Sequence, residues 1–231
     1  MHDLRGDLET LWRAAGRLTL ARGGRSIMFI SATSGEGTSS VAASFALMTA
    51  DRARRSTWLV ELNLTQNRTY EAFRQGFASD IGRPGRAFDA SLGVPPIYDI
   101  RTRDRITRRP RPKLLAVHQI EGTRLLVTRF RKDRLFPDEK VRLSTRADWW
   151  QALRRSADWI IADAPALDTS GAGLAMASQM DRVVLVVEAD RTRPGDVIAL
   201  RREVEDHGGQ VLGVVMNRMA LDARMADRLA S

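Results

Sequence analysis

The feature that most constrains this chain is an alternation of short, almost wholly apolar runs with longer amphipathic stretches. The runs are apolar at nearly every position, as strands covered on both faces of a sheet require. They lie at residues 27–30, 58–62, 125–127, 159–162, 183–187 and 211–216. Between them, segments such as 149–157 and 194–207 place their apolar residues at helical spacing. This order predicts an α/β fold with three layers around a doubly wound, mostly parallel sheet.

The length of the chain predicts one domain. It has 231 residues, which is the size of one large domain. We expect a single domain over residues 1–231, with residues 1–20 as a leading helix outside the sheet. The segment 65–120 breaks the alternation, because it contains five prolines and, between residues 101 and 113, seven basic residues against one acid. We expect it to be an irregular, Arg-rich insertion.

Composition excludes several kinds of site and favours a location. Cysteine is absent, which removes disulfides, thiol nucleophiles and Cys-ligated metals. No apolar run approaches the roughly 18–20 residues of a membrane span, and residues 1–20 have no signal-peptide core, so we expect a cytoplasmic protein.

The formal net charge of +9 favours anionic partners. Two interpretations of Arg101–Lys113 stay open, a solvated surface loop or a patch against an anionic membrane face or acidic partner. Nucleic acid is not expected, because no aromatic residue interleaves these arginines.

The strongest local motif follows the first predicted strand and opens a helix. It contains Gly35, Glu36, Gly37, Thr38, Ser39 and Ser40. Glycines let the backbone approach a phosphate, and the free N–H groups of a helix N-terminus favour negative charge. A phosphate loop places Lys directly after its second glycine, but here Thr38 holds that position, followed by the hydroxyl of Ser39. The alternative is a strand-to-helix turn that binds nothing.

Polar residues end three further predicted strands. One strand leads into Glu61 and Asn63, a second ends at Asp163 followed by Pro165, and a third ends at Asn217. Ligands of doubly wound sheets bind at the carboxyl ends of the strands, where these groups converge. Taken singly, each has a structural alternative; an aspartate at a strand end often caps the following turn.

In this order the motifs resemble those of the bacterial tyrosine kinases of exopolysaccharide assembly, a branch of the deviant-Walker P-loop proteins that also contains the MinD and ParA ATPases. The resemblance covers about residues 1–219, and 65–120 matches poorly. The matching segments are Ser31–Ser39 for the phosphate loop, Val60–Leu64 for the second Walker motif, Asp158–Pro165 for Walker B, and the later segments Val183–Arg193 and Val211–Arg218. The resemblance implies a P-loop NTPase fold like that of MinD and ParA, with ATP or ADP and Mg²⁺ as ligands. It places the residues 35–40 at the phosphates, Asn217 at the adenine, and Ser39 and Asp163 at Mg²⁺. It places Glu61, Asn63 and Asp163 at the catalytic positions.

Three departures from the family pattern bear on activity. The phosphate-loop lysine is missing and no lysine precedes Lys113, so we expect no neighbour in the first hundred residues to replace it, although an arginine supplied by another subunit would restore charge. Glu61 and Asn63 stand where the family has aspartates, and an amide cannot act as a general base. The chain has two tyrosines, Tyr70 and Tyr98, and none after them, so a tail of autophosphorylated tyrosines is not expected.

These observations together predict a catalytically impaired, tyrosine-kinase-like P-loop protein that regulates exopolysaccharide biosynthesis or export and still binds ATP or ADP. The resemblance implies a partner, the cytoplasmic part of an inner-membrane polysaccharide co-polymerase or chain-length regulator. It also implies self-association and a peripheral position at the inner face of the plasma membrane. Two alternatives stay open: an active ATPase or tyrosine kinase with an atypical phosphate loop, and a positioning ATPase like ParA or MinD.

Overall fold

The computed structural model describes residues 1–18, 23–102 and 113–219. Residues 19–22, 103–112 and 220–231 lie outside the described part, and with them most of the basic run between Arg101 and Lys113. In chain order the helices are α1 (Glu9–Gly16), α2 (Thr38–Arg52), α3 (Arg68–Arg74), α4 (Asp148–Ser156), α5 (Ala172–Met176) and α6 (Pro194–Asp206). Short 3₁₀ turns lie at Arg5–Asp7, Lys132–Arg134 and Ala177–Gln179.

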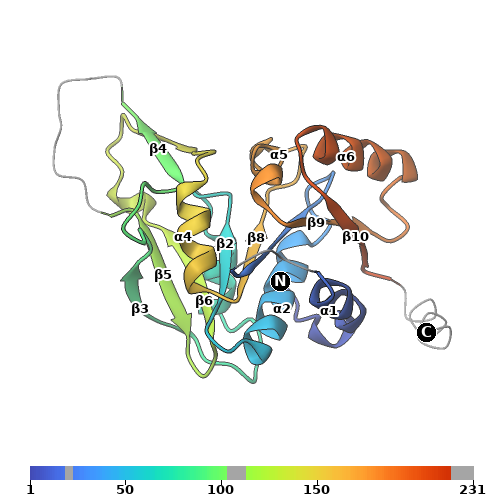
Figure 1. The fold of residues 1–231 in the computed structure, drawn as a ribbon, viewed down its shortest axis with the longest axis horizontal. Coiled ribbons are helices and arrows are strands. Elements are labelled where there is room, and N and C mark those ends of the chain that lie inside the picture. The colour runs from blue at the N-terminus through green and yellow to red at the C-terminus, as the bar shows by residue number, and fades with distance from the viewer. Residues whose placement is uncertain (19–22, 103–112, 220–231) are drawn as a thin grey trace.

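An eight-stranded sheet forms the centre of the molecule, in the order β10-β9-β1-β8-β2-β6-β5-β3 (Figure 1). Its strands are β1 (Arg25–Ile30), β2 (Thr57–Glu61), β3 (Pro84–Asp89), β5 (Leu115–Ile120), β6 (Leu125–Phe130), β8 (Trp159–Asp163), β9 (Arg182–Glu188) and β10 (Val211–Asn217). The six strands from β10 to β6 are parallel, and β5 runs antiparallel to both β6 and β3. A separate antiparallel pair joins β4 (Tyr98–Arg101) to β7 (Lys140–Leu143). The predicted mostly parallel α/β sheet is confirmed.

Both faces of the sheet are covered at its centre, which explains why the central strands β1, β2, β8 and β9 are apolar at nearly every position. In β1, Ile27 and Phe29 face the cluster that contains α1, α2 and α3, whereas Met28 and Ile30 face the cluster that contains α4, α5 and α6. All four side chains are fully buried. Burial of one such side chain contributes about 1.5–3 kcal/mol to stability. This alternation holds the strand ends, and the loops that follow them, at one rigid edge of the sheet.

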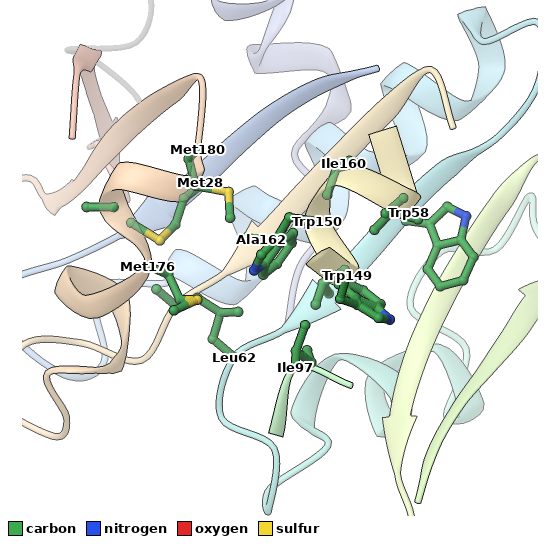
Figure 2. Close-up of a cluster of buried hydrophobic side chains, with 14 of the residues drawn as sticks. Met28, Trp58, Leu62, Ile97, Trp149, Trp150, Ile160, Ala162, Met176 and Met180 are labelled. Carbon is green, nitrogen blue, oxygen red and sulfur yellow. The ribbon is translucent and has the colours of Figure 1, made fainter. Parts of the chain in front are cut away.

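Tryptophans fill the centre of the second cluster (Figure 2). Trp149 and Trp150 of α4 are fully buried, with ring centroids 5.0 Å apart, and Trp149 meets Trp58 of β2 at 6.1 Å. Figure 2 shows Trp150 beside Ala162 of β8 and Trp149 above Ile97. These contacts fix β2 and β8 against one helix layer, and both strands end in carboxylates.

The segment 65–120 is more regular than its composition predicted. It contains α3, β3, β4 and β5, and β5 forms a hairpin with β6. The prolines misled the prediction because Pro84 is the first residue of the edge strand β3, a position where no ladder hydrogen bond is lost. The expectation of an irregular insertion is therefore wrong for these elements.

The leading segment is shorter as a helix than residues 1–20. A 3₁₀ turn at Arg5–Asp7 precedes α1, which begins at Glu9 and ends at Gly16. Leu8 and Ala15 are buried in the cluster around α2, and Trp12 contacts Trp159 at a centroid distance of 5.2 Å. The segment therefore packs onto the helical layer that carries α2, beside the phosphate-loop motif.

Candidate functional site

The loop between β1 and α2 has the backbone geometry of an anion site. Gly35 and Gly37 adopt left-handed conformations, with φ of +95° and +88°, which favour glycine. Among the described residues, no hydrogen bond engages the backbone N–H groups of residues 35–39. Helix α2 begins at Thr38 without a side-chain cap, so these donors lie at the positive end of a 15-residue helix. Five successive free donors at a helix N-terminus form a cradle for phosphate oxygens.

Side chains from distant strands hold this loop in place. The buried Glu36 accepts a hydrogen bond from the Thr33 N–H at 3.1 Å and another from the Thr192 hydroxyl. The Asn217 amide donates to the Glu36 carbonyl at 2.9 Å. Asp168 accepts the Ser34 N–H at 2.9 Å, and this bond lowers the pKa of Asp168. The loop is therefore held in shape by the chain's own side chains.

Glycine is required at position 37 for a second reason. A Cβ atom there would lie 2.1 Å from the Asn217 amide nitrogen. The amide of Asn217, which the resemblance places at the adenine, is used in this structure to hold the phosphate loop to β10. Neither Asn217 nor Glu36 lines the cavity described below.

Thr38, at the lysine position, turns inward. Its hydroxyl donates to the Ser31 hydroxyl at 2.8 Å, and its side chain is buried. Ser31 in turn donates to the Thr33 carbonyl at 3.2 Å. The position that carries a cation in a phosphate loop therefore contributes a neutral hydroxyl that is already engaged within the loop.

Two carboxylates meet at the ends of neighbouring strands. Asp163 ends β8 and Glu61 ends β2, and the parallel register pairs these two residues directly. Asp163 is 3% exposed, and its Oδ1 atom has no hydrogen-bond partner among the described residues. Burial, together with the negative charge of Glu61, raises the pKa of Asp163 to about 8, although the nearby Ser39 hydroxyl opposes the shift. Asp163 is therefore a buried carboxyl group whose ionised form a bound cation would stabilise.

Glu61 has a different role from Asp163. Its carboxylate accepts hydrogen bonds from the backbone N–H groups of Arg68 and Thr69, at 2.9 and 3.0 Å, and from the Thr69 hydroxyl at 2.9 Å. It therefore satisfies the first N–H groups of α3. Burial raises its pKa, and these hydrogen bonds oppose the shift. Glu61 is thus committed to holding α3. Asn63 accepts a 3.3 Å hydrogen bond from the Thr65 hydroxyl.

A cavity of about 550 Å³ joins these groups. Of the residues predicted from sequence, it is lined by Gly35, Gly37, Thr38, Ser39, Ser40, Glu61, Asn63 and Asp163. Sequence reasoning missed the first residues of the chain and two arginines: Met1, His2, Arg68 and Arg218 also line it. The His2 N–H donates to the Ser40 hydroxyl at 3.2 Å. Arg68 directly follows Asn67, which has a left-handed φ of +54°. The polar segment that follows the predicted strand at 58–62 was the signal in the sequence that could have indicated Arg68.

The residues present fit a nucleotide with Mg²⁺. The free N–H row is suited to phosphate oxygens. The orphaned Oδ1 of Asp163 and the Ser39 hydroxyl are the hard oxygen donors that Mg²⁺ prefers. A single carboxylate with one hydroxyl is also the usual extent of protein ligation for Mg²⁺ that is shared with substrate phosphates.

Comparison with known proteins shows the fold. No protein-family model matches the sequence, and no curated protein matches it. Among solved structures, the VpsO kinase domain is similar with a TM-score of 0.60 and 17% identity, covering 94% of each chain. The kinase domain of the Escherichia coli tyrosine kinase ETK is similar at 0.54 and 14%, covering 94% of this chain and 76% of that one. The MinD cell division ATPase of Pyrococcus furiosus is similar at 0.56 and 17%, covering 85% and 73%. Within the described residues, no helix has the length and apolar character needed to cross a bilayer. The chain has the α/β P-loop NTPase fold that these kinase domains and MinD share.

Proposed function

We propose that this chain is a tyrosine-kinase-like P-loop protein that binds ATP or ADP with Mg²⁺, is impaired in catalysis, and regulates exopolysaccharide biosynthesis or export. The observation that carries the proposal is the row of free N–H groups at residues 35–39 beside the unpartnered carboxylate of Asp163. A turn that merely connects a strand to a helix has no need of both features, because buried polar groups are normally satisfied.

The proposed binding uses the chain's own groups in distinct ways. The N–H groups of residues 35–39 would bind phosphate oxygens, and Ser39 and Asp163 would hold Mg²⁺. Mg²⁺, when bound, supplies charge neutralisation to the phosphates. Glu36 and Asp168 keep the loop in shape through their bonds to the Thr33 and Ser34 N–H groups.

Three features support impaired catalysis. Thr38 offers no positive charge, and loss of one preorganised electrostatic donor costs on the order of 10²–10³ in rate. Glu61 is engaged by three donors of α3, so it is not free to accept a proton from a substrate. Asn63 lines the cavity with an amide group, and an amide is not a base near neutral pH.

The regulatory part of the proposal comes from the sequence resemblance and from the kinase domains of similar fold. The partner would be the cytoplasmic part of an inner-membrane polysaccharide co-polymerase, which would bring the chain to the inner face of the membrane. Self-association, which the resemblance implies, would modulate this contact.

Calorimetry of the purified chain with ATP and ADP, with and without Mg²⁺, tests the binding. We expect Mg²⁺-dependent binding of both nucleotides and little or no release of phosphate. The matched variants are Asp163→Asn, which we expect to lose the Mg²⁺ dependence, and Asp196→Asn, an exposed carboxylate on α6, which we expect to behave as the wild type. Absence of binding would refute the nucleotide proposal. Sustained phosphate release that depends on Asp163 would instead identify a working ATPase or kinase.

A further inference from the structure

The cavity contains a cation that the sequence motif lacks. Arg68 is the first residue of the helix α3, is exposed, and lines the cavity together with residues of the phosphate loop. Its positive charge acts on both Asp163 and Glu61, lowering the pKa of each against the effect of burial. Arg68 and the two carboxylates at the strand ends line the same cavity.

Within the described part of the chain, the Arg68 guanidinium forms no ion pair with an acidic side chain. No hydrogen bond or ion pair engages it in residues 1–18, 23–102 and 113–219, although its backbone N–H donates to Glu61. The other arginine at the cavity differs, because Arg218 is paired with Glu188 at 2.9 Å. The remaining acid of the wall, Glu71, is paired with Arg74 at 2.6 Å. Arg68 is thus the cavity arginine available for a ligand.

The position of Arg68 is fixed although its side chain is free. Glu61 accepts hydrogen bonds from the Arg68 and Thr69 N–H groups, which ties the start of α3 to the end of β2. Phe73, further along α3, is fully buried in the cluster around α2. The helix therefore presents Arg68 from a rigid base, which the hydrogen bonds to Glu61 secure.

We propose that Arg68 supplies, within the same chain, the positive charge for the terminal phosphate of the nucleotide that Thr38 cannot supply. The inference rests on the proposed nucleotide binding and deepens it. An arginine fork also binds phosphate through two parallel hydrogen bonds, which a lysine ammonium does not. We then expect the chain to favour a nucleoside triphosphate over a diphosphate, because the triphosphate offers one more anionic group for Arg68 to bind.

The experiment is titration of Mg-ATP and Mg-ADP into the wild type and three variants, Arg68→Gln, Arg68→Lys and Arg202→Gln. Arg202 is an exposed arginine of α6 away from the cavity, so its variant carries the same change of net charge. Loss of a hydrogen bond to a charged group corresponds to about 10–100-fold in affinity. We expect Arg68→Gln to weaken ATP by about that factor and ADP by less. Arg68→Lys keeps the charge but not the fork, so its ATP affinity should lie between those of the wild type and Arg68→Gln, whereas Arg202→Gln should match the wild type.

A coupling measurement adds a readout that damage to the fold does not produce. If Arg68 replaces the lysine, Thr38→Lys should raise ATP affinity more in the Arg68→Gln background than in the wild type, so the two effects are not additive. Unchanged ATP affinity in Arg68→Gln, equal loss for ATP and ADP, or additive effects would each overturn the inference while wild-type binding stands. Absence of nucleotide binding to the wild type would refute the proposed function itself, and the inference with it.

Discussion

Replacing Asp163 by Asn should stabilise the ligand-free protein, and the gain should grow with pH. Asp163 is buried at the end of β8 with one oxygen unpartnered, and its pKa is raised from 3.8 to about 8. The unfolded chain loses this proton near pH 4, whereas the folded chain keeps it until about pH 8. Between these values the unfolded state binds fewer protons, so stability falls as pH rises. Asn has no proton that titrates in this pH range.

The size of the effect follows from the same pKa values. The interval between a pKa of 3.8 and one of about 8 means that ionised Asp163 lowers the free energy of unfolding above pH 8 by at most about 5–6 kcal/mol. Water can reach the carboxylate from the cavity and neighbouring side chains can relax, so the measured gain should be smaller. We expect about 1–3 kcal/mol at pH 8, or roughly 3–10 °C in Tm for a chain of this length.

Thermal and urea unfolding from pH 4 to pH 8.5, without nucleotide or Mg²⁺, measures this gain. The wild type and Asp163→Asn should unfold together near pH 4 and diverge steadily above it. Asp196→Asn serves as the control, since Asp196 is an exposed carboxylate of α6 outside the cavity. Parallel stability curves for the wild type and Asp163→Asn across this range, or a variant less stable at pH 8, would refute the reasoning.

Three further substitutions test the loop and its neighbours. Gly37→Ala places a Cβ atom 2.1 Å from the Asn217 amide nitrogen at a residue with a left-handed φ. We therefore expect the free energy of unfolding to fall by about 1–3 kcal/mol and ATP binding to weaken. The control is Gly195→Ala, which adds a Cβ atom in open space on α6 and should be neutral. Thr38→Lys restores the missing cation and should tighten ATP by about 10-fold in calorimetry, and unchanged affinity would contradict our register of the phosphate loop. Glu61→Ala removes the acceptor for the first N–H groups of α3 and should cost about 1–3 kcal/mol in urea unfolding; an unaffected stability would show that this carboxylate is not structural.

The parallel strands and their helices could be predicted because the strands are continuous apolar runs and the helices have apolar residues at helical spacing. The runs 159–162 and 183–187 became β8 and β9, and the segment 194–207 became α6 almost to the residue. The antiparallel strand β3 escaped prediction because its residues are mostly exposed and it begins at a proline. Edge strands bury one side at most, so they lack the continuous apolar run that marks a central strand.

The site divides in the same way between local and long-range information. The glycine turn and the strand-end carboxylates are local features, and the sequence located them. The hydrogen bond from the Asn217 amide to the Glu36 carbonyl joins residues far apart in the chain, and no local sequence pattern predicts it. Arg68 was missed for a related reason: a cation that reaches the cavity from a different element leaves no trace in the phosphate-loop motif.

The contrast between the two carboxylates separates a structural role from a binding role. Glu61 is buried but receives three hydrogen bonds, as a group retained for stability should. Asp163 is equally buried but keeps one oxygen without a partner, and its burial opposes folding at neutral pH. A fold retains such a group at a site where a ligand completes it, and conflicts between local stability and structure are concentrated at functional sites. Residues of the loop with free N–H groups and this carboxylate line one cavity, which supports our proposal that a chain with Thr38 at the lysine position still binds a nucleotide.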